Sequence, residues 1–190
     1  MDPNISYPQR RNLRFSEFDY SQPGAYFVTI VSQDRKQLFG KVINGEMILN
    51  DVGLMVNGVI EEIPKQYKGI NVEAFVVMPN HVHILFNIAD AVSDPRARLL
   101  NEPDHGQPQG VDPTKKHLSL PELVHRIKSL ATHRYMIGVK EQGWAPFKQR
   151  IWQRSYYEHI IRNERDHQAI YDYILANPMN WEKDEENTCT

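Results

Sequence analysis

The sequence predicts an α+β domain in which a mainly antiparallel sheet carries helices packed on one face. The first observation is a pair of strand-like segments, 71–78 and 81–88, which only Pro79 and Asn80 separate, as in a tight hairpin. The second is the order of strand-like and helix-like segments, which shows no internal repeat. The third is a length of 190 residues with 41% apolar and 24% charged residues, which suits one globular domain and is too short for a (β/α)₈ barrel.

The individual elements follow from composition and spacing. Runs of β-branched and aromatic residues predict strands at 24–32, 71–78, 81–88 and 155–161, with a short hairpin around Asn44 and Gly45. Apolar residues at helical spacing predict helices at 52–66, 120–137 and 164–176. The expected N-caps of these helices are Asn50 or Asp51, Ser119 and Asn163, and Pro178 stops the last helix.

The domain occupies residues 24–181 in this interpretation. A basic extension, 1–23, precedes it, and an acidic tail, 182–190, follows it. Residues 89–118 are rich in Pro, Gly, Asp and Gln and poor in apolar residues, so we expect a flexible insertion within the domain. The acidic tail has little to bury, and we expect it to fray.

Charge is unevenly distributed along the chain, although the net charge is only −2. Residues 1–111, 112–165 and 166–190 carry net charges of −3, +6 and −5. A basic middle can be the footprint of a polyanion site, and it can equally be a solvated helix face rich in Lys and Arg. Charge alone does not decide between the two.

Several classes of protein are excluded. The only cysteine is Cys189, which excludes a disulfide scaffold, a cysteine-based zinc site and a thiol nucleophile. No Gly-rich loop supports ATP or NAD binding, and no Gly-x-Ser-x-Gly elbow is present. No stretch approaches eighteen apolar residues, and the N-terminus lacks the apolar core of a signal peptide. We therefore expect a soluble, cytoplasmic protein without a membrane partner.

Two histidines, His81 and His83, form the first candidate site. Residues i and i+2 of a strand point to the same face, so the two imidazoles should lie side by side. Two neutral imidazoles form half of a site for a divalent cation, whereas a plain structural histidine pair is the alternative. The flanking residues Val82, Ile84 and Phe86 do not keep one clean apolar face, so we expect burial on both sides. A buried histidine pair needs partners, and a metal would be one.

The last predicted helix carries the second candidate, Tyr173 with Asn177 four residues later on the same helical face. A phenol beside a carboxamide oxygen could provide a nucleophile and a metal ligand. Tyr171 lies about 200° away around the helix and cannot share that site. The alternative for Tyr173 is an amphipathic residue that fills the core.

A third candidate is the aromatic and basic segment 144–157, which contains Lys148, Arg150 and Arg154. Its aromatic rings could stack on bases while its cations meet phosphates. The same composition also fits a hydrophobic strap whose cations extend to solvent.

Together these segments resemble a known family. VVMPNHVHILF (76–86) resembles the signature of the HUH single-strand transposases that use one catalytic tyrosine. IWQRSYYEHIIRNERDH…YDYILANP (151–178) is similar to their REP-associated tyrosine transposase branch. The resemblance covers residues 24–181, interrupted by the insertion at 89–118, and implies a ferredoxin-like sheet.

The resemblance also implies a site and a reaction. It places His81 and His83 on the central strand as ligands of Mg²⁺ or Mn²⁺, with Tyr173 as nucleophile and Asn177 as third ligand, where many relatives carry glutamine. The implied activity is cleavage and rejoining of single-stranded DNA beside a hairpin, through a 5′-phosphotyrosine. Tyr156 and Tyr157 are rival nucleophiles by residue type, but they fall on the preceding strand segment.

The expected partner is single-stranded or hairpin DNA, and the phosphate contacts are expected from charge placement. The candidate DNA-binding residues are Arg10, Arg11, Arg14, Lys128, His133, Arg150 and Arg154. Two other functions stay open: a domesticated or inactive relative that binds hairpins without cutting, and a metal-binding or small-ligand domain whose histidines are structural. Relatives act as dimers or as monomers, so a homodimer also stays open, with Tyr173 serving its own chain or a partner.

Overall fold

The computed structural model describes residues 22–89 and 118–187. The strands of this part of the chain are β1 (Gly24–Val31), β2 (Gly40–Ile43), β3 (Glu46–Leu49), β4 (Ile70–Val77), β5 (His81–Ile88) and β6 (Tyr157–Ile160). The α-helices are α1 (Asp51–Gln66), α3 (Leu120–Glu141) and α4 (Glu164–Ala176), with short 3₁₀ turns at Gln33–Arg35 (η1) and Pro178–Lys183 (η3). The predicted strands and helices are thus confirmed, within a few residues at their ends.

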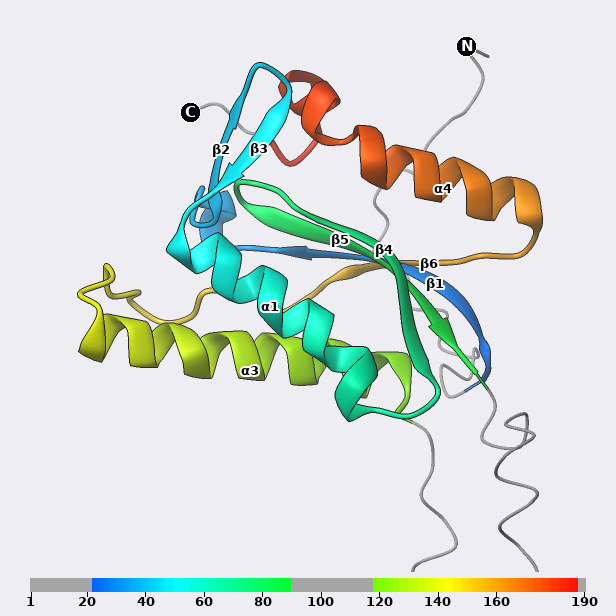
Figure 1. Cartoon of the computed structure of the whole chain (residues 1–190), viewed down its shortest axis with the longest axis horizontal. Coiled ribbons are helices and arrows are strands. Elements are labelled where there is room, and N and C mark those ends of the chain that lie inside the picture. The colour runs from blue at the N-terminus through cyan, green and yellow to red at the C-terminus, as the bar shows by residue number, and fades with distance from the viewer. Residues whose placement is uncertain (1–21, 90–117, 188–190) are drawn as a thin grey trace, which may run out of the picture.

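Four strands form an antiparallel sheet in the order β4-β5-β1-β6 (Figure 1). Helix α1 connects β1 to β4, and α3 lies between β5 and β6 in the chain. Two interleaved strand–helix–strand units arranged in this way form the ferredoxin-like fold. The prediction of an α+β fold with a ferredoxin-like antiparallel sheet is confirmed. Strands β2 and β3 form a separate hairpin between β1 and α1.

Local hydrogen bonds explain where the helices begin. The Asn50 side chain accepts a hydrogen bond from the Gly53 amide at 2.9 Å, and Asn163 accepts one from the Asp166 amide at 2.9 Å. At the start of α3, the Ser119 amide donates to the Glu122 carboxylate at 2.9 Å. Each contact satisfies an amide that a helix N-terminus leaves unpaired, so the predicted caps are confirmed.

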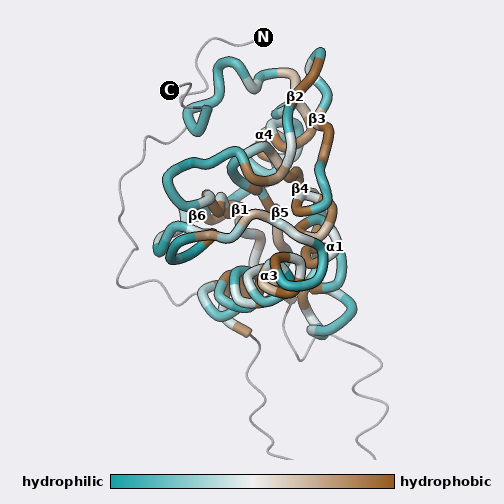
Figure 2. The backbone as a smooth tube through the Cα atoms, turned by 90° about the vertical axis from the view of Figure 1, so that its left-hand side faces the viewer, coloured by the Kyte–Doolittle hydropathy of each residue, from teal (hydrophilic) through white to brown (hydrophobic). Residues whose placement is uncertain are grey.

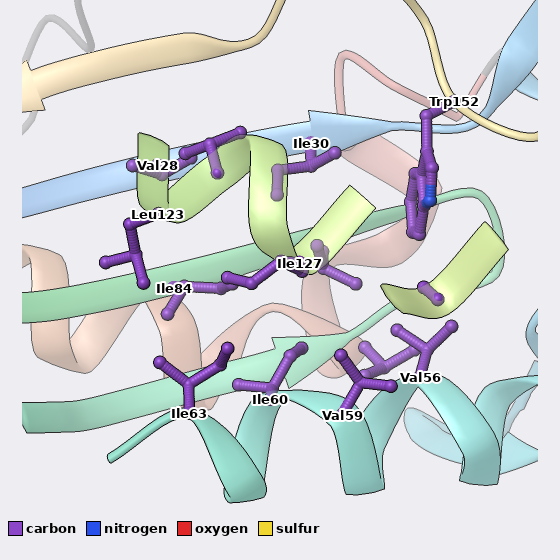
Figure 3. Close-up of a cluster of buried hydrophobic side chains, with 14 of the residues drawn as sticks. Val28, Ile30, Val56, Val59, Ile60, Ile63, Ile84, Leu123, Ile127 and Trp152 are labelled. Atoms are coloured by element: carbon purple, nitrogen blue, oxygen red, sulfur yellow. The ribbon is translucent and has the colours of Figure 1, made fainter. Parts of the chain in front are cut away.

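The main hydrophobic core lies between the sheet and the pair α1 and α3. Figure 3 shows its centre, where Val28 and Ile30 of β1 and Ile84 of β5 meet the two helices. Helix α3 alternates between hydrophilic and hydrophobic residues along its turns, as an amphipathic helix does (Figure 2). Burial of this apolar face is the main contribution to the stability of the fold.

Helix α4 lies on the opposite face of the sheet from α1 and α3 (Figure 1). Its Ile170 and Ile174 pack against Phe27, Ala74 and Leu85 in a second, smaller cluster. The prediction that helices pack on one face therefore holds for α1 and α3 but not for α4. Periodicity shows that a helix has an apolar stripe, but not which face of a sheet the stripe covers.

The acidic tail is ordered where the structure describes it, so the expectation that it frays is wrong for residues 182–187. Turn η3 runs to Lys183, and Glu186 is 5% exposed. Most of the predicted extension 1–23, the insertion 89–118 and the last three residues lie outside the described residues. No helix in the described part of the chain is long and apolar enough to cross a membrane.

Candidate active site

His81 and His83 lie on central strand β5 and point toward α4, while Val82 and Ile84 between and beyond them belong to the main core. Both histidines are buried, at 0% and 3% exposed. Their Nε2 atoms lie 2.9 Å apart. The expected juxtaposition of the two imidazoles, with burial on both sides of the strand, is confirmed.

Asn80 determines which nitrogen of His81 carries a proton. The Asn80 Nδ2 group donates to the carbonyl oxygens of Arg35 at 3.2 Å and of Glu186 at 2.7 Å. The amide orientation is thereby fixed, and Asn80 Oδ1 faces His81 Nδ1 at 2.9 Å. Since this oxygen can only accept, His81 Nδ1 carries the proton, and the neutral ring presents its lone pair at Nε2.

His83 is held by Thr29 and Phe27 of the neighbouring strand β1. Its Nδ1 lies 2.8 Å from Thr29 Oγ1, and its ring stacks on Phe27 with centroids 5.2 Å apart. A hydroxyl can donate or accept, so the His83 proton can reside on either nitrogen. When Thr29 accepts, the lone pair of His83 is also at Nε2, directed toward His81.

Tyr173 of α4 reaches this pair. Its Oη lies 3.2 Å from His83 Nε2, and its ring meets Phe27 edge-on at 6.0 Å. Both contacts lie within one chain. Tyr157 packs on the same Phe27 at 6.3 Å, but burial, and then the charges of Asp166 and Glu185, raise the pKa of its phenol. A phenol that ionises less readily is the poorer nucleophile.

Asn177, one turn after Tyr173, is 1% exposed at the end of α4. Its Nδ2 donates to Asp184 Oδ2 at 3.0 Å, whereas its Oδ1 is buried and has no hydrogen-bond partner among the described residues. A buried carbonyl oxygen of this kind needs an explanation, and a role as a ligand of a bound ion is one. The structure thus places Asn177 in the site's surroundings, with an oxygen free to act as a ligand.

Asp184 is not among the residues predicted from sequence, because the acidic tail that contains it is expected to fray. Asp184 Oδ2 lies 3.9 Å from His81 Nε2, and the ligand atoms of His81, His83 and Asp184 all lie within 4.8 Å of one another. Two imidazole nitrogens, a carboxylate and a buried amide oxygen are a donor set that a divalent cation such as Mn²⁺ accepts. The residues present therefore fit a metal site.

The segment 144–157 is mainly a hydrophobic strap. Trp152 is 4% exposed and packs on Phe39 at 5.1 Å, and Trp144 and Phe147 pack on Tyr135. Trp152 belongs to the core, and Trp144 and Phe147 pack against it, so the geometry favours the hydrophobic strap over rings that stack on DNA bases.

The ammonium group of Lys128 is also bound within the protein. Its Nζ donates to the carbonyl oxygens of Gln153, Arg154 and Ser155 at 3.0, 3.2 and 3.0 Å, and lies 5.4 Å from the Tyr156 ring centroid. Because an ammonium has three protons, its donors are engaged within the chain.

The other candidate DNA-binding residues differ in how far they are exposed to solvent. Arg154 and His133 are exposed and Arg150 is half-buried, while Arg10, Arg11 and Arg14 lie outside the described residues. The strap runs beside the end of β1, since the Gln153 amide donates to Val31 at 2.9 Å. Val31 in turn pairs with His81, so Arg150 and Arg154 flank the end of the sheet that carries the histidines.

Comparison with known proteins shows what this chain is similar to. No family model matches the chain. A relative from Haemophilus influenzae, named only as an uncharacterized protein, is 34% identical over 96% of this chain and 95% of its own length. A REP-associated tyrosine transposase from Escherichia coli is 22% identical over 84% of this chain and 69% of its own length.

A solved structure of a REP-associated tyrosine transposase bound to a REP hairpin matches with a TM-score of 0.51 and 21% identity, over 93% of this chain and 74% of that one. The chain is thus similar to REP-associated tyrosine transposases in sequence and in fold. The two segments that carry the resemblance in sequence, 76–86 with its histidine pair and 151–178 with Tyr173, meet on one face of the sheet.

Proposed function

We propose that this chain is a metal-dependent enzyme that cuts single-stranded DNA with Tyr173 and joins the cut end to another strand. The observation that carries the proposal is the 3.2 Å contact between Tyr173 Oη and His83 Nε2, beside a second buried imidazole. Residues far apart in the sequence supply a nucleophile and ligand atoms to one face of the sheet. The relative solved with a hairpin supports hairpin-flanked DNA as the substrate class.

The proposed metal ligands are His81 and His83 through Nε2 and Asn177 through its unpartnered Oδ1. When bound, Mg²⁺ or Mn²⁺ supplies Lewis acidity that makes a phosphodiester more electrophilic. The protein's own contribution is orientation: Asn80 and Thr29 hold the two rings so that their ligand nitrogens converge.

Tyr173 would then attack the phosphorus atom of the scissile phosphate. A bond forms between Oη and phosphorus, the bond from phosphorus to the 3′ oxygen breaks, the phenol loses its proton, and the 3′ oxygen gains one. The product is a 5′-phosphotyrosine that keeps a phosphodiester bond, so a 3′-OH can reverse the step and join the strand without ATP.

For DNA binding, we propose phosphate contacts by His133, Arg150 and Arg154, and by Arg10, Arg11 and Arg14 of the extension. Arg150 and Arg154 flank the histidine end of the sheet, where a bound strand has to arrive. Lys128 has its donors engaged by carbonyl oxygens, so we assign it to holding the strap that carries Arg154.

The test is a denaturing-gel assay for a covalent adduct between the protein and labelled DNA hairpins with single-stranded flanks. The wild-type chain should form an adduct in Mn²⁺ or Mg²⁺ and lose it in EDTA. Tyr173→Phe should form none. Tyr171→Phe is the matched control, because this residue lies on the same helix about 200° away, and it should behave like the wild type.

Two results would overturn the proposal. An adduct that persists in Tyr173→Phe would assign the nucleophile elsewhere, with Tyr156, Tyr157 and Tyr171 as the next candidates. Hairpin binding without any adduct, across a pool of random flanks and both metals, would make the chain a relative that binds DNA without cutting it.

A further inference from the structure

Asp184 lies where the chain returns to the histidines after α4 and η3. Its side chain is 4% exposed, and its Oδ2 is 3.9 Å from His81 Nε2. That separation is too long for a hydrogen bond. It suits two ligands of one ion, because ligand atoms about 2.0–2.2 Å from a metal lie roughly 3 to 4 Å apart.

The charge of Asp184 lacks compensation from a basic side chain. Within residues 22–89 and 118–187, no lysine or arginine forms an ion pair with it. Its two hydrogen bonds come from neutral donors, Asn177 Nδ2 at 3.0 Å and the Glu186 amide at 2.7 Å. A buried carboxylate with only neutral donors is costly unless a cation is close by.

Contacts of Glu186, two residues after Asp184, hold the segment that carries Asp184 in place. Glu186 is 5% exposed and accepts a hydrogen bond from Arg35 Nε at 2.9 Å. The carbonyl oxygen of Glu186 also accepts from Asn80, the residue that fixes His81. The same few residues thus orient the imidazole and hold the carboxylate, so Asp184 is pre-organised beside the ligand nitrogens.

We propose that Asp184 supplies a carboxylate oxygen to the cation bound by His81 and His83, and that Asn177 positions this carboxylate while offering its own oxygen. The proposal deepens the proposed function, on which it rests. It predicts a site of two nitrogens and two oxygens. Carboxylate ligands favour Mg²⁺ and Mn²⁺, whereas imidazole alone favours softer ions such as Ni²⁺.

The experiment measures Mn²⁺ and Ni²⁺ binding to the full chain by isothermal titration calorimetry, without DNA. Asp184→Asn and Asp184→Ala should weaken Mn²⁺ binding at least tenfold. They should weaken Ni²⁺ binding less, so that the ratio of Mn²⁺ to Ni²⁺ affinity falls. Glu185→Gln, an exposed neighbour with the same charge change, is the matched control and should bind both metals like the wild type.

His81→Ala separates the two proposals. If His81→Ala loses Mn²⁺ binding and both Asp184 variants keep it, the proposal for Asp184 is overturned while the histidine site stands. If His81→Ala also binds like the wild type, the metal site of the proposed function falls. A fall in Mn²⁺ affinity with an unchanged metal ratio would mean a structural role only, and would also overturn the proposal for Asp184.

Discussion

The two faces of the sheet are built in different ways. Among residues 22–89 and 118–187, the cluster between the sheet and the helices α1 and α3 has 23 buried apolar residues, whereas the cluster under α4 has five. The α4 face buries Thr29, His81, His83 and Asn177 instead. One face therefore stabilises the fold through apolar burial, and the other gives up part of that stabilisation to hold polar groups.

Helix α4 is held to its face partly by polar contacts. His159 of β6 lies 2.9 Å from Asp166, and Glu73 of β4 forms an ion pair with His167. These pairs lie at opposite edge strands of the sheet, on either side of the small apolar cluster. The difference between the faces implies that substitutions on one should change stability, while substitutions on the other should change chemistry.

The largest expected effect falls on the α4 face. Tyr173→Phe should reduce DNA cleavage at least 10⁴-fold, which is about 5.4 kcal/mol of transition-state stabilisation. Its free energy of unfolding should change by less than about 1 kcal/mol, because one partly exposed hydroxyl is lost. Urea denaturation beside the gel assay checks both, and a large loss of stability would break the distinction between the faces.

Ile84 and Leu85 are adjacent on β5 and both 0% exposed, and their side chains lie in the two different clusters. Substitutions at these positions therefore compare the two faces of the sheet directly. Ile84→Ala, in the main core, should cost about 3–5 kcal/mol of unfolding free energy, since the packed helices cannot close the cavity. Leu85→Ala should cost about 2–3 kcal/mol, because α4 can settle toward the sheet. Equal losses in urea denaturation would show that the faces contribute alike.

The pair of Glu73 and His167 should give a pH-dependent contribution. Burial alone raises the pKa of Glu73, but hydrogen bonds from Asn87 and His167, with the charge of His167, outweigh it and lower the pKa below 4.5. A lowered folded-state pKa stabilises above the ordinary pKa and loses this effect as pH falls through the folded value.

Glu73→Gln should therefore lower the free energy of unfolding by about 1 kcal/mol at neutral pH. The difference from the wild type should shrink as the pH falls from 4.5 through the lower folded-state pKa, below which both states bind the proton. Glu46→Gln, an exposed carboxylate on β3, controls for the charge change. A difference that persists unchanged at low pH would remove the ion pair as its cause.

The smallest expected effects distinguish Arg154 of the strap from Lys128 of α3, which contacts the strap. Arg154→Gln should weaken hairpin binding a fewfold and reduce the salt dependence of binding by about one phosphate contact. Lys128→Gln should leave that salt slope unchanged and lower stability by about 1 kcal/mol, because carbonyl oxygens lose their donor. Fluorescence anisotropy of labelled hairpins at several salt concentrations measures this slope. A lower salt dependence of binding in Lys128→Gln would show that Lys128 contacts DNA.

Much of this arrangement could be predicted from sequence because it is local. The hairpin at Pro79 and Asn80, the cap at Asn163 and the shared face of His81 and His83 depend on residues a few positions apart. The placement of α4 and of Asp184 could not be predicted, because it depends on contacts between distant segments. Composition correctly described residues 182–187 as acidic, but their hydrogen bonds to Arg35 and Asn80 leave no local signal.

Asn80 also has a consequence for the order of folding. Its hydrogen bond to Glu186 spans 106 residues, and that from Arg35 to Glu186 spans 151. Contacts that close such long loops carry a large entropy cost and tend to form after hairpins and helices. During refolding, helical circular dichroism should therefore return before Mn²⁺ binding, since the histidines acquire their final orientation only when the two distant segments have docked.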